Sequence, residues 1–209
     1  MEYAVPDERM DEAMDLLDIY RQDKVALDLL HEFYSFLPDA VEDWIREIRL
    51  VNRKRGMFLL AAMTQESGYL YLISSEGVEF HGSLQDGLWD RELLDFFGYE
   101  DRDSFRKMSS TPDKYQVYEP MDSDIDICPA CHVESGELHE LGCPVELCPW
   151  CGGQLIQCSC RFDKLEVDAL ETERDLIRFE ELLHEKGRIA YSPEQRPSFV
   201  DEGPGIIIE

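Results

Sequence analysis

All seven cysteines of this chain lie within residues 128–160, and this crowding constrains the fold more than any other feature of the sequence. Together with one histidine they make eight possible metal ligands: Cys128, Cys131, His139, Cys143, Cys148, Cys151, Cys158 and Cys160. Zinc in proteins is bound by thiolates and imidazoles that arrive in short-spaced pairs, four to each structural ion. The eight ligands therefore predict two structural zinc ions.

The order of the ligands favours two consecutive sites over interleaved ones. Ser135-Gly136 marks a turn, so the chain that leaves Cys131 is expected to bring His139 back to the same place. The first predicted site comprises Cys128, Cys131, His139 and Cys143, and the second comprises Cys148, Cys151, Cys158 and Cys160. In a cross-braced ribbon, the two Cys-Pro-x-Cys pairs would instead share one ion, and their separation also fits that form. The sequence leaves both pairings open.

His132 directly follows the first Cys-Pro-x-Cys pair and could replace His139 as a ligand. The turn argument favours His139, so His132 is expected to face solvent. Disulfides are disfavoured because the number of cysteines is odd and nothing in the sequence indicates secretion. Iron–sulfur clusters also take four thiolates, but three cysteines and a histidine beside a set of four cysteines favour zinc.

The cysteine cluster carries four short motifs: Cys128-Pro-x-Cys131, Gly136-x-Leu138-His139-x-x-Gly142-Cys143, Glu146-x-Cys148-Pro-x-Cys151-Gly152-Gly153-Gln154 and Cys158-x-Cys160. It resembles a cysteine-rich zinc module found in many uncharacterised bacterial proteins. The resemblance covers residues 128–160 only, and it departs at His132, where glycine is usual, and at Pro144, where an acidic residue is common. It implies bacterial or bacteriophage origin and a zinc module, and it implies no reaction.

The composition predicts a soluble, cytoplasmic protein. At 209 residues with 44% hydrophobic content, the chain can bury one good core and a satellite module. Its longest wholly apolar run, Met57–Met63, is far too short to span a membrane. The N-terminus lacks the basic start and apolar stretch of a signal peptide. Thiols in the cytoplasm stay reduced and free to bind metal.

The chain carries 46 acidic and 20 basic residues, for a net charge of −26. Residues 122–160 contain seven acidic residues and neither lysine nor arginine. Zinc ribbons that hold nucleic acid need basic side chains to neutralise phosphates. We therefore expect no nucleic-acid binding and no membrane association, and instead an unidentified protein partner with a basic surface. The oligomeric state is not predicted.

Apolar periodicity predicts an α+β fold. Helices are expected from Pro6 to Tyr20, from Val25 to Phe36 and from Pro38 to Ile48, the last because Val41, Trp44, Ile45 and Ile48 share one helical face. Strands are expected at Met57–Thr64, Tyr69–Ser74 and Val78–Phe80, followed by helices at Leu88–Phe97 and Arg102–Met108 and a strand at Tyr115–Tyr118. The short connections between the strands favour antiparallel hairpins.

The predicted organisation has three parts. Residues 1–121 form an α+β domain with helices packed on one face of a small antiparallel sheet. Residues 122–162 form the compact two-zinc module, and residues 163–209 form a C-terminal helix and an extended tail. This helix is expected at Leu165–Lys186 and ends at Gly187, and the tail begins at Ser192.

No catalytic constellation is visible in the sequence. Catalytic zinc keeps one coordination position open, and eight ligands for two ions leave none. The other histidines, His31, His81 and His184, lie in separate predicted elements with no nucleophile at motif spacing. We expect a zinc-stabilised acidic protein of adaptor or immunity type that binds a protein partner without catalysis. The alternatives are a nucleic-acid mimic that inhibits a DNA- or RNA-binding protein, and an uncharacterised enzyme.

Overall fold

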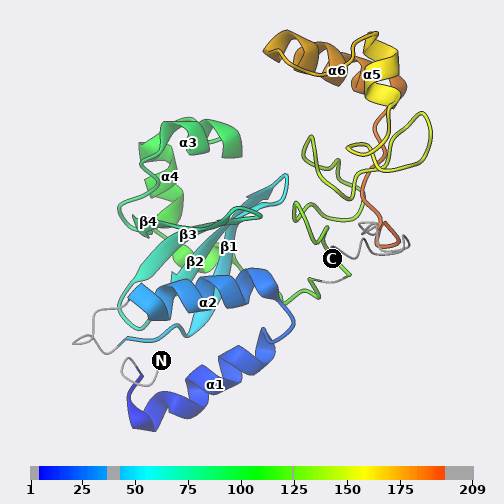
Figure 1. Cartoon of the computed structure of the whole chain (residues 1–209). Coiled ribbons are helices and arrows are strands. Elements are labelled where there is room, and N and C mark those ends of the chain that lie inside the picture. The colour runs from blue at the N-terminus through cyan, green and yellow to red at the C-terminus, as the bar shows by residue number, and fades with distance from the viewer. Residues whose placement is uncertain (1–4, 37–42, 124, 196–209) are drawn as a thin grey trace, which may run out of the picture. The chain divides into compact units, whose positions relative to one another are not determined.

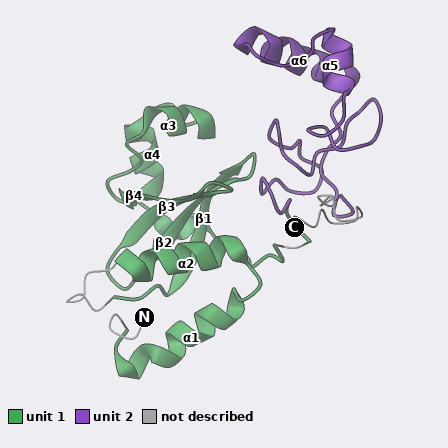
Figure 2. Cartoon of the chain, in the orientation of Figure 1, with its two compact units in different colours: residues 1–127 green, residues 128–209 purple. Residues whose placement is uncertain are grey.

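The computed structural model describes residues 5–36, 43–123 and 125–195 (Figure 1). The chain divides into two compact units, residues 1–127 (unit 1) and residues 128–209 (unit 2), shown in Figure 2. The three-part division expected from the sequence stays a prediction. In the described ranges, every helix is too short or too polar to cross a lipid bilayer.

Unit 1 is built on a five-stranded antiparallel sheet with the order β4-β3-β2-β1-β5. Its strands are β1 (Glu47–Lys54), β2 (Met57–Met63), β3 (Gly68–Ser74), β4 (Gly77–Ser83) and β5 (Gln116–Val117). A two-residue turn joins β1 to β2, and both of its residues, Arg55 and Gly56, have positive φ angles of 50° and 75°. Such turns match the right-handed twist of the strands, which favours the tight hairpin. The α+β class and the antiparallel sheet are confirmed.

Helices cover both faces of this sheet, as Figure 1 shows. On one face lie α1 (Met10–Ile19), which follows a short 3-10 turn at Asp7–Arg9, and α2 (Lys24–Phe36). On the other lie α3 (Arg91–Phe97) and α4 (Arg102–Ser109), followed by a second 3-10 turn at Pro112–Lys114. The expectation of helices on one face is therefore wrong.

Strand β2 shows the physical reason for the two covered faces. Phe58 and Leu60 pack in the cluster with α2, whereas Leu59 and Ala61 pack in the cluster with α3 and α4. Successive side chains of a strand point to opposite faces, so an unbroken apolar run belongs to a strand buried on both sides. The Met57–Met63 run carried this information, because a strand with one solvated face would alternate.

The third predicted helix is wrong where the structure describes it. Its first part, residues 38–42, lies outside the described residues. Residues 43–46 have no regular structure, and Ile48 lies in β1. The pairing register of β1 shifts between Leu50 and Asn52, and the resulting irregularity breaks the alternation of inward side chains along the strand. Ile45 and Ile48 are buried as the pattern required, but against the α2 face of the sheet.

Helix α1 and the segment before α2 show two further features of unit 1. Helix α1 forms within the predicted range, with Met14 and Ile19 more than half exposed and Ala13 and Leu16 buried. The buried carboxylate of Asp23, before α2, accepts the backbone N–H groups of Ala26 and Met121, each at 3.0 Å. Burial raises the pKa of this carboxyl despite those hydrogen bonds. Asp23 thus ties the segment that follows β5 to the start of α2.

In the described part of unit 2, residues 128–195, two helices form in place of the single predicted helix Leu165–Lys186. Helix α5 (Cys160–Leu165) ends at Glu166, whose φ of 57° lies in the left-handed region. Helix α6 (Glu173–Lys186) begins with a capping box, in which Thr172 accepts the N–H of Asp175 and the Asp175 side chain accepts the N–H of Thr172. The left-handed residue Glu166 ends one helix and the capping box at Thr172 begins the next, so the apolar period that predicted a single helix does not hold between them.

Candidate metal centres

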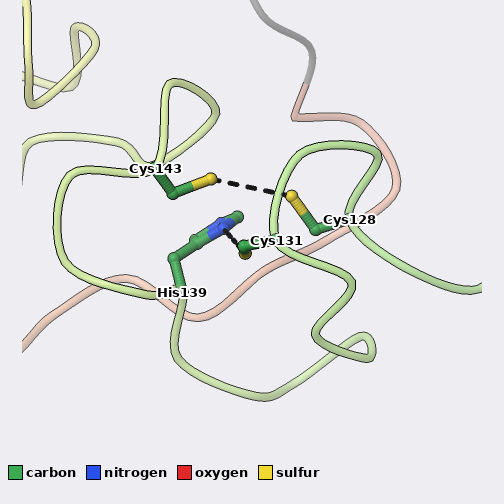
Figure 3. Close-up of side chains that lie close together, drawn as sticks. All are labelled: Cys128, Cys131, His139 and Cys143. Atoms are coloured by element: carbon green, nitrogen blue, oxygen red, sulfur yellow. Dashed lines mark hydrogen bonds between the residues drawn. The ribbon is translucent and has the colours of Figure 1, made fainter. Parts of the chain in front are cut away.

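The structure brings the four ligands of the first predicted site together. The ligand atoms of Cys128, Cys131, His139 and Cys143 lie within 4.8 Å of one another, and all four residues are buried (Figure 3). The Sγ atoms of Cys128 and Cys143 are 3.8 Å apart, and Cys131 Sγ lies 3.4 Å from His139 Nδ1. Tetrahedral zinc at ordinary bond lengths separates two sulfurs by about 3.8 Å and a sulfur from a nitrogen by about 3.6 Å. The donor set thus fits a structural zinc ion.

The second predicted site is also assembled. The Sγ atoms of Cys148, Cys151, Cys158 and Cys160 lie within 4.8 Å of one another. The two Cys-Pro-x-Cys pairs belong to different groups, so the ligands gather consecutively and the cross-braced alternative is not the arrangement seen. Thiolate donors and one imidazole in two sets of four are the chemistry of two structural zinc sites.

Both Cys-Pro-x-Cys pairs fold into the same tight turn. In the first turn, the Cys128 N–H donates to the Val133 carbonyl at 2.8 Å and the His132 N–H donates to the Cys128 carbonyl at 2.9 Å. The second turn has the same two bonds. The Cys148 N–H donates to the Gly153 carbonyl at 2.7 Å, and the Gly152 N–H donates to the Cys148 carbonyl at 2.8 Å. These bonds orient each pair of thiols toward the same point. The same local sequence, Cys-Pro-x-Cys, thus forms the same turn and supplies two donors in each site.

His132 takes the place in the first turn that Gly152 takes in the second. Its φ is 58° and that of Gly152 is 74°, so both residues lie in the left-handed region. This conformation costs a residue with a Cβ about 1–2 kcal/mol, so glycine is the less strained residue at this position. His132 is only 3% exposed, so the expectation that it faces solvent is wrong. His139, and not His132, lies with the cysteines of the first group.

The thiols of Cys128 and Cys143 titrate as a pair. Hydrogen bonding with Cys131, and then with Cys143, lowers the pKa of Cys128 to about 3. Hydrogen bonding with Cys128, and then with Cys131, raises the pKa of Cys143, because one thiol keeps the proton that the other gives up. Zinc coordination replaces such shared protons, since only thiolates bind the metal.

A glutamine that sequence reasoning missed orients the ligand histidine. Gln195 is buried, and its Oε1 lies 2.9 Å from His139 Nε2, while its Nε2 donates to the Ala190 carbonyl at 3.0 Å. The second bond directs the amide oxygen toward His139, so His139 Nε2 carries the proton and Nδ1 presents its lone pair to the cysteines. Metal-bound histidines usually have such a partner on the other ring nitrogen. Gln195 belongs to no motif, and no sequence pattern indicates it.

A buried ion pair between Arg188 and Glu146 joins the segment that precedes Gln195 to the first site. Arg188 donates from Nε and Nη2 to the two carboxylate oxygens of Glu146, at 2.7 and 2.8 Å, and from Nη2 to the His139 carbonyl at 2.7 Å. The Glu146 side chain is 1% exposed. Paired bonds of this kind between guanidinium and carboxylate are the strong form of the interaction. Glu146 occurs in the module motif, where its role was not apparent.

Residues 188–195, which we call the closing segment, therefore cover the first site. The Tyr191 N–H donates to the Glu137 carbonyl at 2.8 Å, and the Gly136 N–H donates to the Tyr191 carbonyl at 2.9 Å. The Tyr191 ring also meets the His139 ring edge-on, with centroids 5.5 Å apart. The first part of the predicted tail is thus held by the metal site, and residues 196–209 lie outside the described residues.

The second site is packed beneath the two helices of unit 2. Helix α5 begins at Cys160 itself, and Cys148 shares a buried cluster with Leu165 of α5 and Phe179 of α6. Arg161 donates to the carbonyls of Leu155 and Cys158, at 2.9 and 2.8 Å, and so fixes the loop that carries Cys158. The remaining histidines, His31, His81 and His184, lie in α2, β4 and α6 and belong to neither group.

We predict that Gln195→Ala lowers the zinc affinity of the first site about 10- to 100-fold, because His139 loses the partner that sets its tautomer. The affinity of the second site should not change. Titration with a chromogenic chelator, read as the number of zinc ions removed at each concentration, measures both. Gln157→Ala, a substitution of an exposed glutamine in the same unit, is the matched control. Equal affinity in Gln195→Ala and the control would contradict the assignment.

No protein-family model, curated protein or solved structure matches the chain. The two ligand groups are compatible with zinc-binding modules on their geometry and donor chemistry, and no family match adds to this. The functional inference consequently depends on the metal centres, the charge and the packing of the chain itself.

Proposed function

We propose that this chain is a zinc-stabilised, non-catalytic protein of adaptor or immunity type whose acidic surface binds a basic protein. The observation that carries the proposal is that two complete sets of four donors use all seven cysteines. A zinc ion with four protein ligands has no open position for water or substrate, as a catalytic zinc requires. Bound zinc would serve here as a cross-link that supplies folding free energy.

The packing around the first site supports this structural role. The first site is sealed by the closing segment, with Gln195 on the ligand histidine and Tyr191 on its ring. A substrate would have to displace these residues to approach the donors. Metal in such surroundings holds segments of chain together.

The charge of the chain supports a basic protein partner. Acidic residues exceed basic ones by 46 to 20, and exposed carboxylates line unit 1, for example along the outer face of α1. Complementary charge accelerates encounter between proteins and selects against partners of like sign. The same charge repels phosphate, which argues against nucleic acid as the ligand.

The resemblance of residues 128–160 to a cysteine-rich bacterial module fits the same picture. It supports bacterial or bacteriophage origin, and reduced thiols fit a cytoplasmic setting. The two tight turns, with glycine or a strained histidine at the same position, give that resemblance a structural basis.

A second candidate function is mimicry of nucleic acid, and one observation favours it. Asp11, Asp15 and Asp18 are exposed on one face of α1. Successive members of this row are separated by about 6 Å and 4.5 Å along the helix axis, given a rise of about 1.5 Å per residue. A mimic requires a row of negative charges on a rigid element, so that a DNA- or RNA-binding protein accepts it in place of phosphates.

Partner capture followed by titration tests the proposed function. The immobilised full chain should retain a basic protein from an extract of its native host at low salt and release it as salt rises, because exposed charge pairs are screened over about 8–10 Å. Mass spectrometry identifies the captured protein, and anisotropy measures its direct binding. If added DNA displaces the chain from that protein, mimicry is the better account.

The matching control is direct titration of the chain with duplex and single-stranded DNA and RNA at physiological salt. We expect no measurable binding, because residues 122–160, which hold all eight metal ligands, contain neither lysine nor arginine. Tight, salt-sensitive binding to a nucleic acid would overturn the protein-binding proposal.

A further inference from the structure

The two metal sites differ in how far solvent reaches them. The first is closed on every ligand, with Cys128, Cys131, His139 and Cys143 each no more than 5% exposed. In the second, Cys148 is buried, Cys151 is exposed, and Cys158 and Cys160 are half-buried. The closing segment covers the first site, whereas in the second the turn Cys151-Gly152-Gly153 lies at the surface.

We propose that the second zinc site is a redox-sensitive switch, in which a peroxide oxidises exposed thiolates, zinc leaves, and α5 and α6 lose their anchor. The inference rests on the proposed zinc occupancy and adds to it a difference in chemical role between the two sites. The first site is then a permanent cross-link, and the second is a cross-link that oxidants open.

The chemistry requires an accessible thiolate and a second one nearby. The Cys151 thiolate attacks a peroxide oxygen, the O–O bond breaks, and Cys151 becomes a sulfenic acid. A neighbouring thiolate, from Cys158 or Cys160, attacks the sulfenic sulfur to form a disulfide and expel hydroxide. In sum, two thiolates, one hydrogen peroxide and two protons yield a disulfide and two waters. Only two of the four thiolates would then remain to hold a zinc ion at this site, which would weaken its binding.

The geometry of the second ligand group fits both steps of this reaction, the oxidation and the disulfide formation. The four Sγ atoms of the second group lie within 4.8 Å of one another, so a disulfide needs only a small movement. Oxidation of cysteine follows thiolate character and exposure, and zinc coordination provides the thiolate in both sites alike. Exposure therefore decides between the sites, and it favours the second.

Opening the second site has a structural consequence within unit 2. Cys160 is the first residue of α5, and Cys148 is part of the buried cluster that holds α6. The ring of Trp150, inside the second Cys-Pro-x-Cys pair, also packs against Phe179 of α6 with centroids 6.4 Å apart. Loss of zinc removes the cross-link beneath this cluster and exposes the apolar residues Phe179 and Leu183. They would extend the exposed Leu176 and Ile177 into a larger apolar surface.

Peroxide treatment of the zinc-loaded full chain tests the switch. A chromogenic zinc chelator records release, and we expect the zinc ion of the second site to leave at least about tenfold faster than that of the first site. Mass spectrometry should then find a disulfide among Cys151, Cys158 and Cys160, with Cys128, Cys131 and Cys143 still reduced. A dithiol reductant with added zinc should restore both the metal and the protection of α6 from hydrogen exchange.

Cys151→His provides the matching variant, because histidine retains a zinc donor and removes the exposed thiolate. It should bind two zinc ions and lose neither rapidly to peroxide. If this variant fails to hold its second zinc, the order of alkylation of the cysteines in the native wild-type chain decides the question. Equal release from both sites, or earlier modification of the first site, would overturn the switch. A purified chain without zinc would instead refute the metal assignment before any oxidant is added.

Discussion

Removal of zinc is expected to unfold unit 2 and to leave unit 1 folded. Each of the two buried clusters of unit 2 is small and includes at least one cysteine of a metal site. Structural zinc sites in small modules bind with apparent free energies of about 10–16 kcal/mol, which is more than so small a core supplies. Unit 1 has two larger apolar clusters, one on each face of its sheet, and holds none of the ligands.

Elemental analysis should first find two zinc ions per purified chain. A strong chelator should then open residues 128–195 to protease and to hydrogen exchange, and β2 and β3 should keep their protection. Adding zinc back to the chelated chain should restore protection in unit 2, which controls for irreversible damage. One zinc ion, iron in place of zinc, or melting of both units together would contradict the prediction.

Arg188→Ala is expected to destabilise unit 2 by about 3–5 kcal/mol, because it leaves the Glu146 carboxylate buried without its partner. The substitution also removes the donor to the His139 carbonyl, so the closing segment should detach from the first site. Urea unfolding of the zinc-loaded chain, followed by zinc release and circular dichroism, measures the change. Arg178→Ala removes an exposed arginine of α6 and is the matched control.

Replacing both Glu146 and Arg188 distinguishes two free energies: the penalty for a buried carboxylate without its partner, and the net contribution of the ion pair to stability. The double variant Glu146→Leu with Arg188→Met carries no buried charge and should recover much of the lost stability. If Arg188→Ala costs no more than Arg178→Ala, the ion pair does not hold the closing segment. If the double variant is as unstable as the single one, the arginine acts chiefly through the His139 carbonyl.

The sequence predicted the metal sites best, because the chemistry of the side chains alone indicates that they bind a metal ion. Thiols in short-spaced pairs have few uses other than metal binding in a reduced compartment, and the turn at Ser135-Gly136 predicted the consecutive grouping that the structure shows. Strands β2 and β3 and helix α2 followed from apolar pattern and turn residues. Protein binding, the absence of catalysis and the type of partner stay predictions.

The errors arose where more distant contacts outweigh a local pattern. Trp44, Ile45 and Ile48 have helical spacing, yet pairing with β2 places Ile48 in a strand whose register is irregular. The apolar period from Leu165 onward predicts one helix, but Glu166 takes a left-handed conformation and Thr172 starts a new one. A period shows which residues become buried, and pairing and capping decide in which element they do so.

What the sequence by itself determined is the set of seven cysteine donors, because all the thiols of the chain lie within 33 residues, with His139 favoured over His132 as the eighth donor. Only the tertiary structure decided how those sites are closed. His139 meets Gln195 across 56 positions, and Glu146 meets Arg188 across 42. Neither contact corresponds to an apolar period, a turn signal or a motif in the sequence. Each forms only because the folded chain brings the closing segment back to the first site. Burial likewise distinguishes the sealed first site from the exposed second, because the fold determines which thiols solvent reaches.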